Sequence, residues 1–238
     1  MFDSLEIIKE NSHEDASLRL QELIGKFIQD NEKFSLGLSG GSTPRFFYQN
    51  FANTYQENSD ISLWTIDDRH VPLNDEISNQ RMINEIFSKT KMNILELQFN
   101  ENPNMSADEY SKLVLSKIQN FNSAILGVGD DGHIASLFPN TTAMNNKSIG
   151  FVANEVNILS KWRITSTFEL LSNIENVYLL VTGENKSDIL KEIGKNNGLP
   201  VNQLIIKGEA SSKIKEEIKK QISTKTVCYK TNFYSSIY

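Results

Sequence analysis

The chain has 238 residues, a length typical of one large domain or two small ones. Its 24 basic and 30 acidic residues leave a formal net charge of −6, which argues against a nucleic-acid partner because such proteins present a basic face. Hydrophobic residues make up 39% of the chain, enough for a packed core, so wholesale disorder is excluded.

Three further features bear on cellular location. Cys228 is the single cysteine, so no intramolecular disulfide can form, which fits a reducing compartment. The first residues lack the basic segment and the apolar run of a signal peptide. The longest apolar stretches, such as Val177–Val181, are far shorter than the ~20 residues that a membrane span requires. We therefore expect a soluble, cytoplasmic protein with no membrane partner.

Short apolar runs alternate with amphipathic segments along the chain. The runs predict strands buried on both faces, at Phe34–Leu38, Ile61–Ile66, Ala124–Val128 and Val177–Val181. Helical spacing and capping residues predict helices at His13–Gln29, Asn79–Phe87, Ser106–Ile118, Glu184–Ile193 and Glu209–Lys220. Ser106 is the expected N-cap of its helix, and His13 is expected at the surface. The alternation predicts one Rossmann-like, doubly wound α/β domain over residues 1–238, with a mostly parallel sheet and helices on both faces.

A glycine-containing segment, Leu38–Arg45, follows the first apolar run and precedes a helical stretch. Thr43 suits an N-cap and Pro44 suits the first helical position. The N–H groups of such a loop and of the helix start point at one spot, where an anion such as phosphate is favoured. The segment is not a P-loop, because no Gly-Lys-Ser/Thr follows, and a simple tight turn is the alternative.

A second polar segment, Asp67-Asp68-Arg69-His70, begins where the run Ile61–Ile66 ends. In open α/β sheets, ligands bind at the carboxyl ends of the strands. These side chains therefore either face a ligand or form a solvated loop held by an Asp–Arg pair. Ser78 is a candidate N-cap for the helix that follows.

The most specific segment, residues 127–139, reads Gly-Val-Gly-Asp-Asp-Gly-His-Ile-Ala-Ser-Leu-Phe-Pro. It places His133 after a strand, with Asp131 two residues before it. A histidine at a strand end with a nearby carboxylate is a candidate general base near neutral pH. A lone histidine is more often a satisfied buried group, but the glycine-rich setting favours the base.

Two cations mark a fourth region. Arg163 opens a strand-like segment, and Lys186 falls in the first turn of the predicted helix Glu184–Ile193. A cation there is unfavourable to the helix dipole unless an anion binds nearby. An ordinary surface pair is the simpler interpretation from these residues alone.

Three common catalytic arrangements are not supported. The chain has no His-Glu-x-x-His motif and no cysteine cluster, and its three histidines are widely spaced, so a metal site is not indicated. A serine nucleophile is not the favoured interpretation either. The run Gly127-Val128-Gly129-Asp130-Asp131-Gly132 is not interpreted as a dinucleotide-binding site.

Taken in this order, the four segments resemble the glucosamine-6-phosphate isomerase/6-phosphogluconolactonase family, and within it the 6-phosphogluconolactonases. The matching motifs span roughly residues 30–195. The run Gly-His-Ile-Ala-Ser-Leu-Phe-Pro that contains His133 is the most specific of them.

The resemblance implies hydrolysis of 6-phospho-D-glucono-1,5-lactone to 6-phosphogluconate in the oxidative pentose phosphate pathway, without a metal or organic cofactor. It implies that His133 is the general base that activates water and that Asp131 orients it. By the same likeness, the substrate or the developing anion is held by Ser39, Gly40, Gly41, Ser42, Thr43, Arg45, Asp67, Arg69, Arg163 and Lys186. The implied partner is a small sugar-phosphate lactone, and no oligomeric state is indicated.

The chain departs from the family pattern in three places. Members usually read Asp-Glu-Arg where this chain has Asp68 in the middle, and the shorter side chain reaches less far. The proline-rich approach to the Arg-x-Thr segment is replaced by Ser160-Lys161-Trp162. The usual ending, Asp followed by alanines, is missing from Lys225–Tyr238, to which we assign no role.

Two other functions stay open. The sister isomerase/deaminase activity on glucosamine 6-phosphate uses a carboxylate shortly after the Gly-His motif, where this chain has Ser136-Leu137-Phe138-Pro139. A sugar-phosphate sensor that binds without turnover would not need His133, but a fold does not fix a function.

The positions of the arginines refine what the net charge predicts about the binding site. The chain has 19 lysines and only five arginines, which are Arg19, Arg45, Arg69, Arg81 and Arg163. All but Arg19 fall in or beside the matched motifs, and a guanidinium suits planar recognition of anions. We expect a small cationic pocket built by these arginines in an acidic surface, with Arg81 on a helix surface as the alternative.

Overall fold

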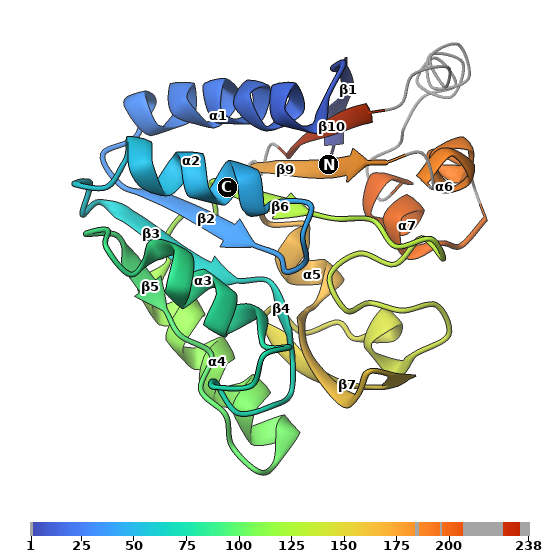
Figure 1. Ribbon diagram of the computed structural model, residues 1–238. Coiled ribbons are helices and arrows are strands. Elements are labelled where there is room, and N and C mark those ends of the chain that lie inside the picture. The colour runs from blue at the N-terminus through green and yellow to red at the C-terminus, as the bar shows by residue number, and fades with distance from the viewer. Residues whose placement is uncertain (1, 184–185, 196, 207–225, 234–238) are drawn as a thin grey trace, which may run out of the picture.

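The computed structural model describes residues 2–183, 186–195, 197–206 and 226–233. A seven-stranded sheet with the order β1-β10-β9-β6-β2-β3-β5 forms its centre (Figure 1). The pairs from β9 to β5 are parallel, whereas β10 pairs antiparallel with both β1 and β9. The strand bounds are β1 Phe2–Lys9, β2 Phe34–Leu38, β3 Ile61–Thr65, β5 Asn93–Leu95, β6 Ser123–Leu126, β9 Asn176–Thr182 and β10 Thr226–Phe233. The predicted fold class, a mostly parallel α/β sheet, is confirmed.

Helices cover both faces of this sheet. One face carries α1 (His13–Asp30), α2 (Arg45–Thr54) and α3 (Asn79–Phe87). The other carries α4 (Pro103–Lys117), α5 (Phe168–Leu171), α6 (Ser187–Glu192) and α7 (Pro200–Ile206). Residues of one strand alternate between the two cores, as strand geometry requires: Ile125 packs with α1 and α2, whereas Ala124 and Leu126 pack with α4 and α5.

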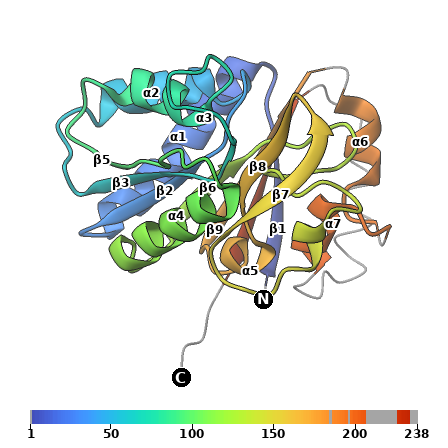
Figure 2. The same cartoon turned by 90° about the horizontal axis from the view of Figure 1, so that it is seen from below.

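A second, three-stranded antiparallel sheet has the order β4-β8-β7. Its strands are β4 (Asp67–Arg69), β8 (Ser160–Ser166) and β7 (Phe151–Ile158). Figure 2 shows the β7–β8 hairpin standing beside the main sheet. Because a single residue, Ile66, separates β4 from the end of β3, the second sheet starts at the carboxyl end of the first. The sequence did not predict this sheet, since β4 has three residues and all of them are polar.

Two of the predicted N-caps are wrong, one by four residues and one by a single residue. Asn102 caps α4 by accepting from the Asn104 N–H, and Pro103 follows at the first position, so Ser106 lies inside the helix. There the buried Ser106 hydroxyl accepts from the N–H of Asn100 instead. In α2 the N-cap is Pro44 rather than Thr43, and no side chain caps it.

Other predictions hold or lie outside the described residues. Ser78 caps α3 by accepting from the Arg81 N–H, as predicted. The described part of the helix predicted at Glu184–Ile193 is α6, with Lys186 as its N-cap residue. The helix predicted at Glu209–Lys220 lies outside the described residues. Within the described ranges, no helix is both long enough and apolar enough to cross a bilayer.

Candidate active site

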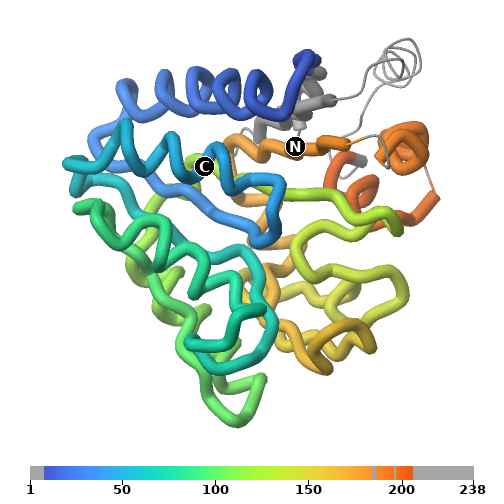
Figure 3. Tube along the Cα trace, viewed as in Figure 1, coloured from blue at the N-terminus to red at the C-terminus, as the bar shows by residue number. Residues whose placement is uncertain are grey.

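A cavity of about 270 Å³ lies where the carboxyl ends of the parallel strands meet the second sheet. Figure 3 traces the segments that follow β2, β3 and β6 toward the same side of the main sheet. This is the edge at which open α/β sheets bind ligands. The cavity is lined by Ser39, Gly40, Gly41, Asp67, Arg69, Asn79, Gly127, Val128, Gly129, His133, Ala135, Ser136, Phe138, Arg163 and Lys186.

The glycine loop after β2 forms one wall. The Tyr48 hydroxyl of α2 donates to the carbonyl of Ser39 at 2.8 Å and so fixes the start of the loop. Gly41 adopts a positive φ of 94°, a conformation that costs glycine little. A Cβ on Gly40 would overlap the carboxamide of Asn79, so only glycine lets the loop approach α3 this closely. The segment for which a simple tight turn was the alternative therefore forms a wall of the cavity.

The remainder of that segment points elsewhere. Ser42 and Arg45 are exposed, and neither lines the cavity. The carbonyl of Thr43 lies 2.6 Å from Nε2 of His13, the first residue of α1. His13 is half-buried and contacts this loop.

Two arginines face each other across the second sheet. In the antiparallel pairing of β4 with β8, Arg69 is the direct partner of Arg163. Side chains of directly opposed residues lie on the same face of a sheet, and both of these line the cavity. Among the described residues, no carboxylate lies within ion-pair distance of either guanidinium. The alternative of a solvated loop held by an Asp–Arg ion pair is therefore wrong. The two arginines bring positive charge to a cavity that also contains the carboxyl group of Asp67.

Each guanidinium is held by neutral acceptors. Nη2 of Arg163 donates to the carbonyl of Ile158 at 2.7 Å, while its buried Nε has no partner in the described structure. Nη1 of Arg69 donates to the carbonyl of Ile77 at 2.7 Å and to Oδ1 of Asn79 at 3.1 Å. Burial and then the charge of Arg69 lower the pKa of Arg163. Arg163 is 3% exposed, so interpreting it as part of a surface pair is wrong.

The two neighbouring aspartates have different roles in the structure. Asp67 shares the cavity face with Arg69, and its Oδ2 accepts from the Ser136 hydroxyl at 2.5 Å. Burial raises the pKa of Asp67, while Ser136 and the two arginines act in the opposite direction. Asp68 lies buried outside the cavity lining and accepts from the N–H groups of Asn79 and Gln80 at the start of α3. Burial raises the pKa of Asp68 to about 6.

His133 is fixed from three sides. Its Nδ1 lies 2.5 Å from Oδ1 of Asp131, and because a carboxylate can only accept, Nδ1 carries the proton. The ring stacks on Phe138 with centroids 4.2 Å apart. A Cβ on Gly129 would overlap the imidazole, so that glycine makes room for the ring. No hydrogen bond among the described residues uses Nε2, which leaves its lone pair available in the cavity.

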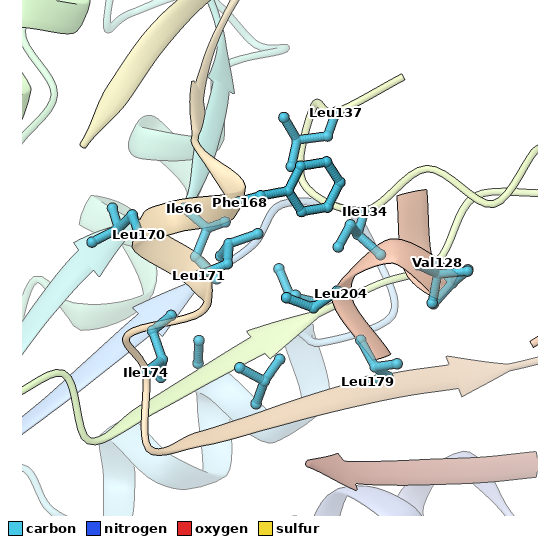
Figure 4. Packing of buried hydrophobic residues seen from close by; sticks show 14 of the residues in the cluster. Ile66, Val128, Ile134, Leu137, Phe168, Leu170, Leu171, Ile174, Leu179 and Leu204 are labelled. Atoms are coloured by element: carbon cyan, nitrogen blue, oxygen red, sulfur yellow. The ribbon is translucent and has the colours of Figure 1, made fainter. Parts of the chain in front are cut away.

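The chain on either side of His133 is anchored in the core. Ile134 and Leu137 are fully buried and pack with Phe168 and Leu204 (Figure 4). Partial burial works against ionisation of Asp131, but the hydrogen bonds from His133 outweigh it, so the pKa of Asp131 is lowered. Asp131 therefore stays a carboxylate and keeps the histidine in the tautomer with a free Nε2.

Lys186 closes another side of the cavity. Its Nζ forms an ion pair of 2.6 Å with Oδ1 of Asp130, on the segment that also carries His133. Among the described residues, the structure shows no cluster of three or more His, Cys, Asp or Glu side chains that could hold a metal ion.

Comparison with known proteins gives the family. The family model described as "Glucosamine-6-phosphate isomerases/6-phosphogluconolactonase" matches residues 9–212. The chain belongs to this family. It is 33% identical over 177 residues to the 6-phosphogluconolactonase of Haemophilus influenzae, a match that covers 70% of this chain and 76% of the relative. It is 30% identical over 186 residues to that of Thermotoga maritima, covering 76% and 84%.

The fold agrees with that of a solved family member. The crystal structure of the Thermotoga maritima 6-phosphogluconolactonase superimposes with a TM-score of 0.73 and 27% identity, covering 82% of this chain and 90% of that one. The expected resemblance to the glucosamine-6-phosphate isomerase/6-phosphogluconolactonase family is confirmed.

The structure brings together most, not all, of the residues that the family likeness singled out. Those in the cavity lining are Ser39, Gly40, Gly41, Asp67, Arg69, His133, Arg163 and Lys186, and Asp131 lies behind His133. Ser42, Thr43 and Arg45 are not in the lining. Arg81 is exposed and pairs with Glu85, so the alternative that it lies on a helix surface is confirmed. Of the four arginines near the family motifs, two therefore build the pocket.

Seven residues of the cavity lining were not among the expected site residues: Asn79, Gly127, Val128, Gly129, Ala135, Ser136 and Phe138. Asn79 follows the helix cap and looked like an ordinary helix start. Ser136 and Phe138 lie in the histidine motif, but only the fold shows that they contact Asp67 and the His133 ring. The available signal was their place in the family's most specific run.

Proposed function

We propose that this chain hydrolyses 6-phospho-D-glucono-1,5-lactone to 6-phosphogluconate, with His133 as the general base. One observation carries the proposal: an imidazole with a free Nε2, oriented by Asp131, shares a cavity with the opposed cations Arg69 and Arg163. The base suits activation of water, and the two guanidinium groups suit a phosphorylated substrate. The 6-phosphogluconolactonase relatives give further support.

The chemistry requires one proton relay. His133 Nε2 takes a proton from water as the water oxygen bonds to C1 of the lactone, which places negative charge on the former carbonyl oxygen. Cations in a cavity away from bulk water stabilise such an oxyanion strongly. When the intermediate collapses, the bond from C1 to the ring oxygen breaks and the imidazolium returns the proton to that oxygen. His133 thus acts as base and then as acid.

The remaining residues hold the substrate in this scheme. The phosphate on C6 and the oxyanion at C1 are each bound by some of these groups: the glycine loop, Arg69, Arg163 and Lys186. Asp67 offers a carboxylate oxygen to a sugar hydroxyl, since Ser136 occupies only its Oδ2. Asp131 keeps His133 in the required tautomer.

The sister isomerase/deaminase activity is the alternative within the family. It moves a proton between C1 and C2 and uses a carboxylate shortly after the Gly-His motif. The equivalent stretch here is Ser136-Leu137-Phe138-Pro139, which contains no acid, and Phe138 stacks on the His133 ring. The lactonase is therefore the favoured activity.

The setting of the enzyme is part of the proposal. We place it in the cytoplasm, with a small sugar-phosphate lactone rather than nucleic acid or membrane as its partner, in keeping with the net charge of −6 and the single cysteine. We propose that residues 1–238 form one domain. The pairing of β1 with β10, from the two ends of the chain, in the main sheet supports this.

The deciding experiment supplies purified protein with freshly prepared 6-phosphogluconolactone and compares the rate with a buffer blank, because the lactone also opens spontaneously. We expect hydrolysis well above the blank. Glucosamine 6-phosphate in a parallel assay tests the sister activity. Binding of either compound without acceleration would instead indicate a sugar-phosphate sensor.

A further inference from the structure

Asn79 is the best-connected cavity residue that the proposed mechanism leaves without a role. It is the first residue of α3 and is buried, with 5% of its surface exposed. Its carboxamide touches three parts of the site. Nδ2 donates to the main-chain carbonyl of Asp67 at 2.8 Å, Oδ1 accepts from Nη1 of Arg69 at 3.1 Å, and the group packs against the backbone of Gly40.

These contacts determine how the Arg69 guanidinium is used. Nη1 carries two hydrogens, and the carbonyl of Ile77 and Oδ1 of Asn79 accept one each. No hydrogen bond among the described residues engages Nε or Nη2 of Arg69. The guanidinium therefore keeps one complete edge, Nε with Nη2, for a ligand, and such an edge binds a phosphate with two parallel hydrogen bonds.

We propose that Asn79 is a positioning residue. By accepting a hydrogen bond from Nη1 of Arg69 and packing against Gly40, it directs the Nε–Nη2 edge of Arg69 toward a phosphate bound at the glycine loop. The proposal deepens the proposed function, since it concerns the same cavity. It assigns Asn79 no contact with the reacting atoms. Its effect reaches the substrate through Arg69.

The carboxamide is the group that this place requires. Asn79 faces a guanidinium on one side and a carbonyl oxygen on the other, so it must accept and donate at once. An aspartate there would lose the bond to the Asp67 carbonyl and would pair with Arg69, which removes the free positive charge. An alanine would leave an Nη1 hydrogen unsatisfied, so the guanidinium could turn.

A double-mutant cycle tests the proposal. Inorganic phosphate binding is measured by titration calorimetry, and lactone hydrolysis by steady-state kinetics, for wild type, Asn79→Ala, Arg69→Ala and the double variant. We expect Asn79→Ala to raise the phosphate Kd and the lactone KM about tenfold with kcat little changed. In the Arg69→Ala background the same substitution should have almost no further effect on either constant.

Two more variants separate positioning from packing. Asn79→Asp keeps the shape, so a pure packing role predicts wild-type phosphate affinity, whereas positioning predicts a loss at least as large as for alanine. Asn202→Ala removes an equally buried asparagine that bonds the Gly194 N–H outside the cavity, and it should lower thermal stability without raising KM.

The outcomes distinguish this proposal from the proposed function. Additive effects of Asn79→Ala and Arg69→Ala, wild-type affinity in Asn79→Asp, or a wild type that does not bind phosphate would each overturn the positioning role. A wild type that binds phosphate with the expected coupling but does not hydrolyse the lactone would leave the positioning role standing and remove the proposed function.

Discussion

Arg69 and Arg163 are direct cross-strand partners in the small sheet, with their guanidinium groups in one cavity and no carboxylate in ion-pair distance within the described structure. Like charges placed directly opposite each other destabilise a sheet. Burial of Arg163 adds a desolvation cost, which its lowered pKa reflects. A bound dianion relieves both costs at once. We therefore expect this site to bind a phosphate, with part of the binding energy supplied by relief of this repulsion.

The first prediction concerns stabilisation by phosphate. A ligand that binds only the folded state raises the free energy of unfolding by about 2.7 kcal/mol at a hundredfold excess over its Kd. We expect inorganic phosphate to stabilise the wild type in this way, and Arg163→Met to lose most of the gain because the buried Nε donor is removed. Thermal unfolding at a series of phosphate concentrations measures the effect.

Arg81→Met is the matched control for that experiment. Arg81 is a surface arginine paired with Glu85 and lies outside the cavity lining. It should keep the full response to phosphate. Equal responses of Arg163→Met and the wild type, or an equal loss in both variants, would show that phosphate does not act through the arginine pair.

The second prediction concerns the base. We expect His133→Ala to fold normally, because the side chain is 29% exposed, and to lose about 10²–10⁴-fold in kcat, the usual contribution of a general base. His70→Ala is the control, since His70 packs against Phe99 with a tilted ring and lies outside the cavity lining. Steady-state kinetics with the spontaneous rate subtracted measure both. Near-normal turnover of His133→Ala would remove the proposed mechanism.

Much of the main sheet could be predicted because its signal is local. The central strands β2, β6 and β9 are buried along most or all of their length, so each appears in the sequence as a nearly continuous apolar run. The small sheet could not be predicted in this way. Its strand β4 is Asp-Asp-Arg, and only pairing with β8 makes it a strand. Ser106 failed as a cap because Asn102, a turn earlier, satisfies the same rule.

The functional site shows the same difference between local contacts, which the sequence predicts, and contacts between distant segments. Asp131 and His133 are two residues apart, so their contact could be inferred from the sequence. Arg69 and Arg163 lie 94 positions apart, and their opposition depends on the register of two short strands. The contacts of Asn79 likewise depend on how α3 meets the glycine loop. Pairwise geometry between distant segments is what periodicity and motifs do not encode.

The third prediction concerns Asp130, which neutralises Lys186 at the cavity. The carboxylate is 72% exposed and the lysine 21% exposed, so the pair contributes about 0.2–1 kcal/mol. We expect Asp130→Asn to free Lys186 and to lower the lactone KM by up to about fivefold at low salt. The gain should shrink at 1 M salt, where the Debye length is only about 3 Å.

Asp188→Asn is the matched control for Asp130→Asn. It removes the same charge from an exposed ion pair with Lys191 on α6, and not from Lys186. If both variants lower KM equally, the effect belongs to net charge. A wild-type KM in Asp130→Asn at low salt would show that Lys186 does not contribute to binding.

The fourth prediction concerns pH and stability through Asp68, which is buried against the start of α3. Burial raises the pKa of Asp68 from 3.8 to about 6, so between these values the folded state holds a proton that the unfolded state has released. Stability from this group is therefore present at low pH and is lost as pH rises through that window, by about 3 kcal/mol in all. In Asp68→Asn this dependence of the unfolding free energy on pH should be missing, whatever the absolute stability of the variant. Chemical denaturation at intervals from pH 4 to pH 7 measures it, and parallel curves for the two proteins would mean that Asp68 is ionised throughout.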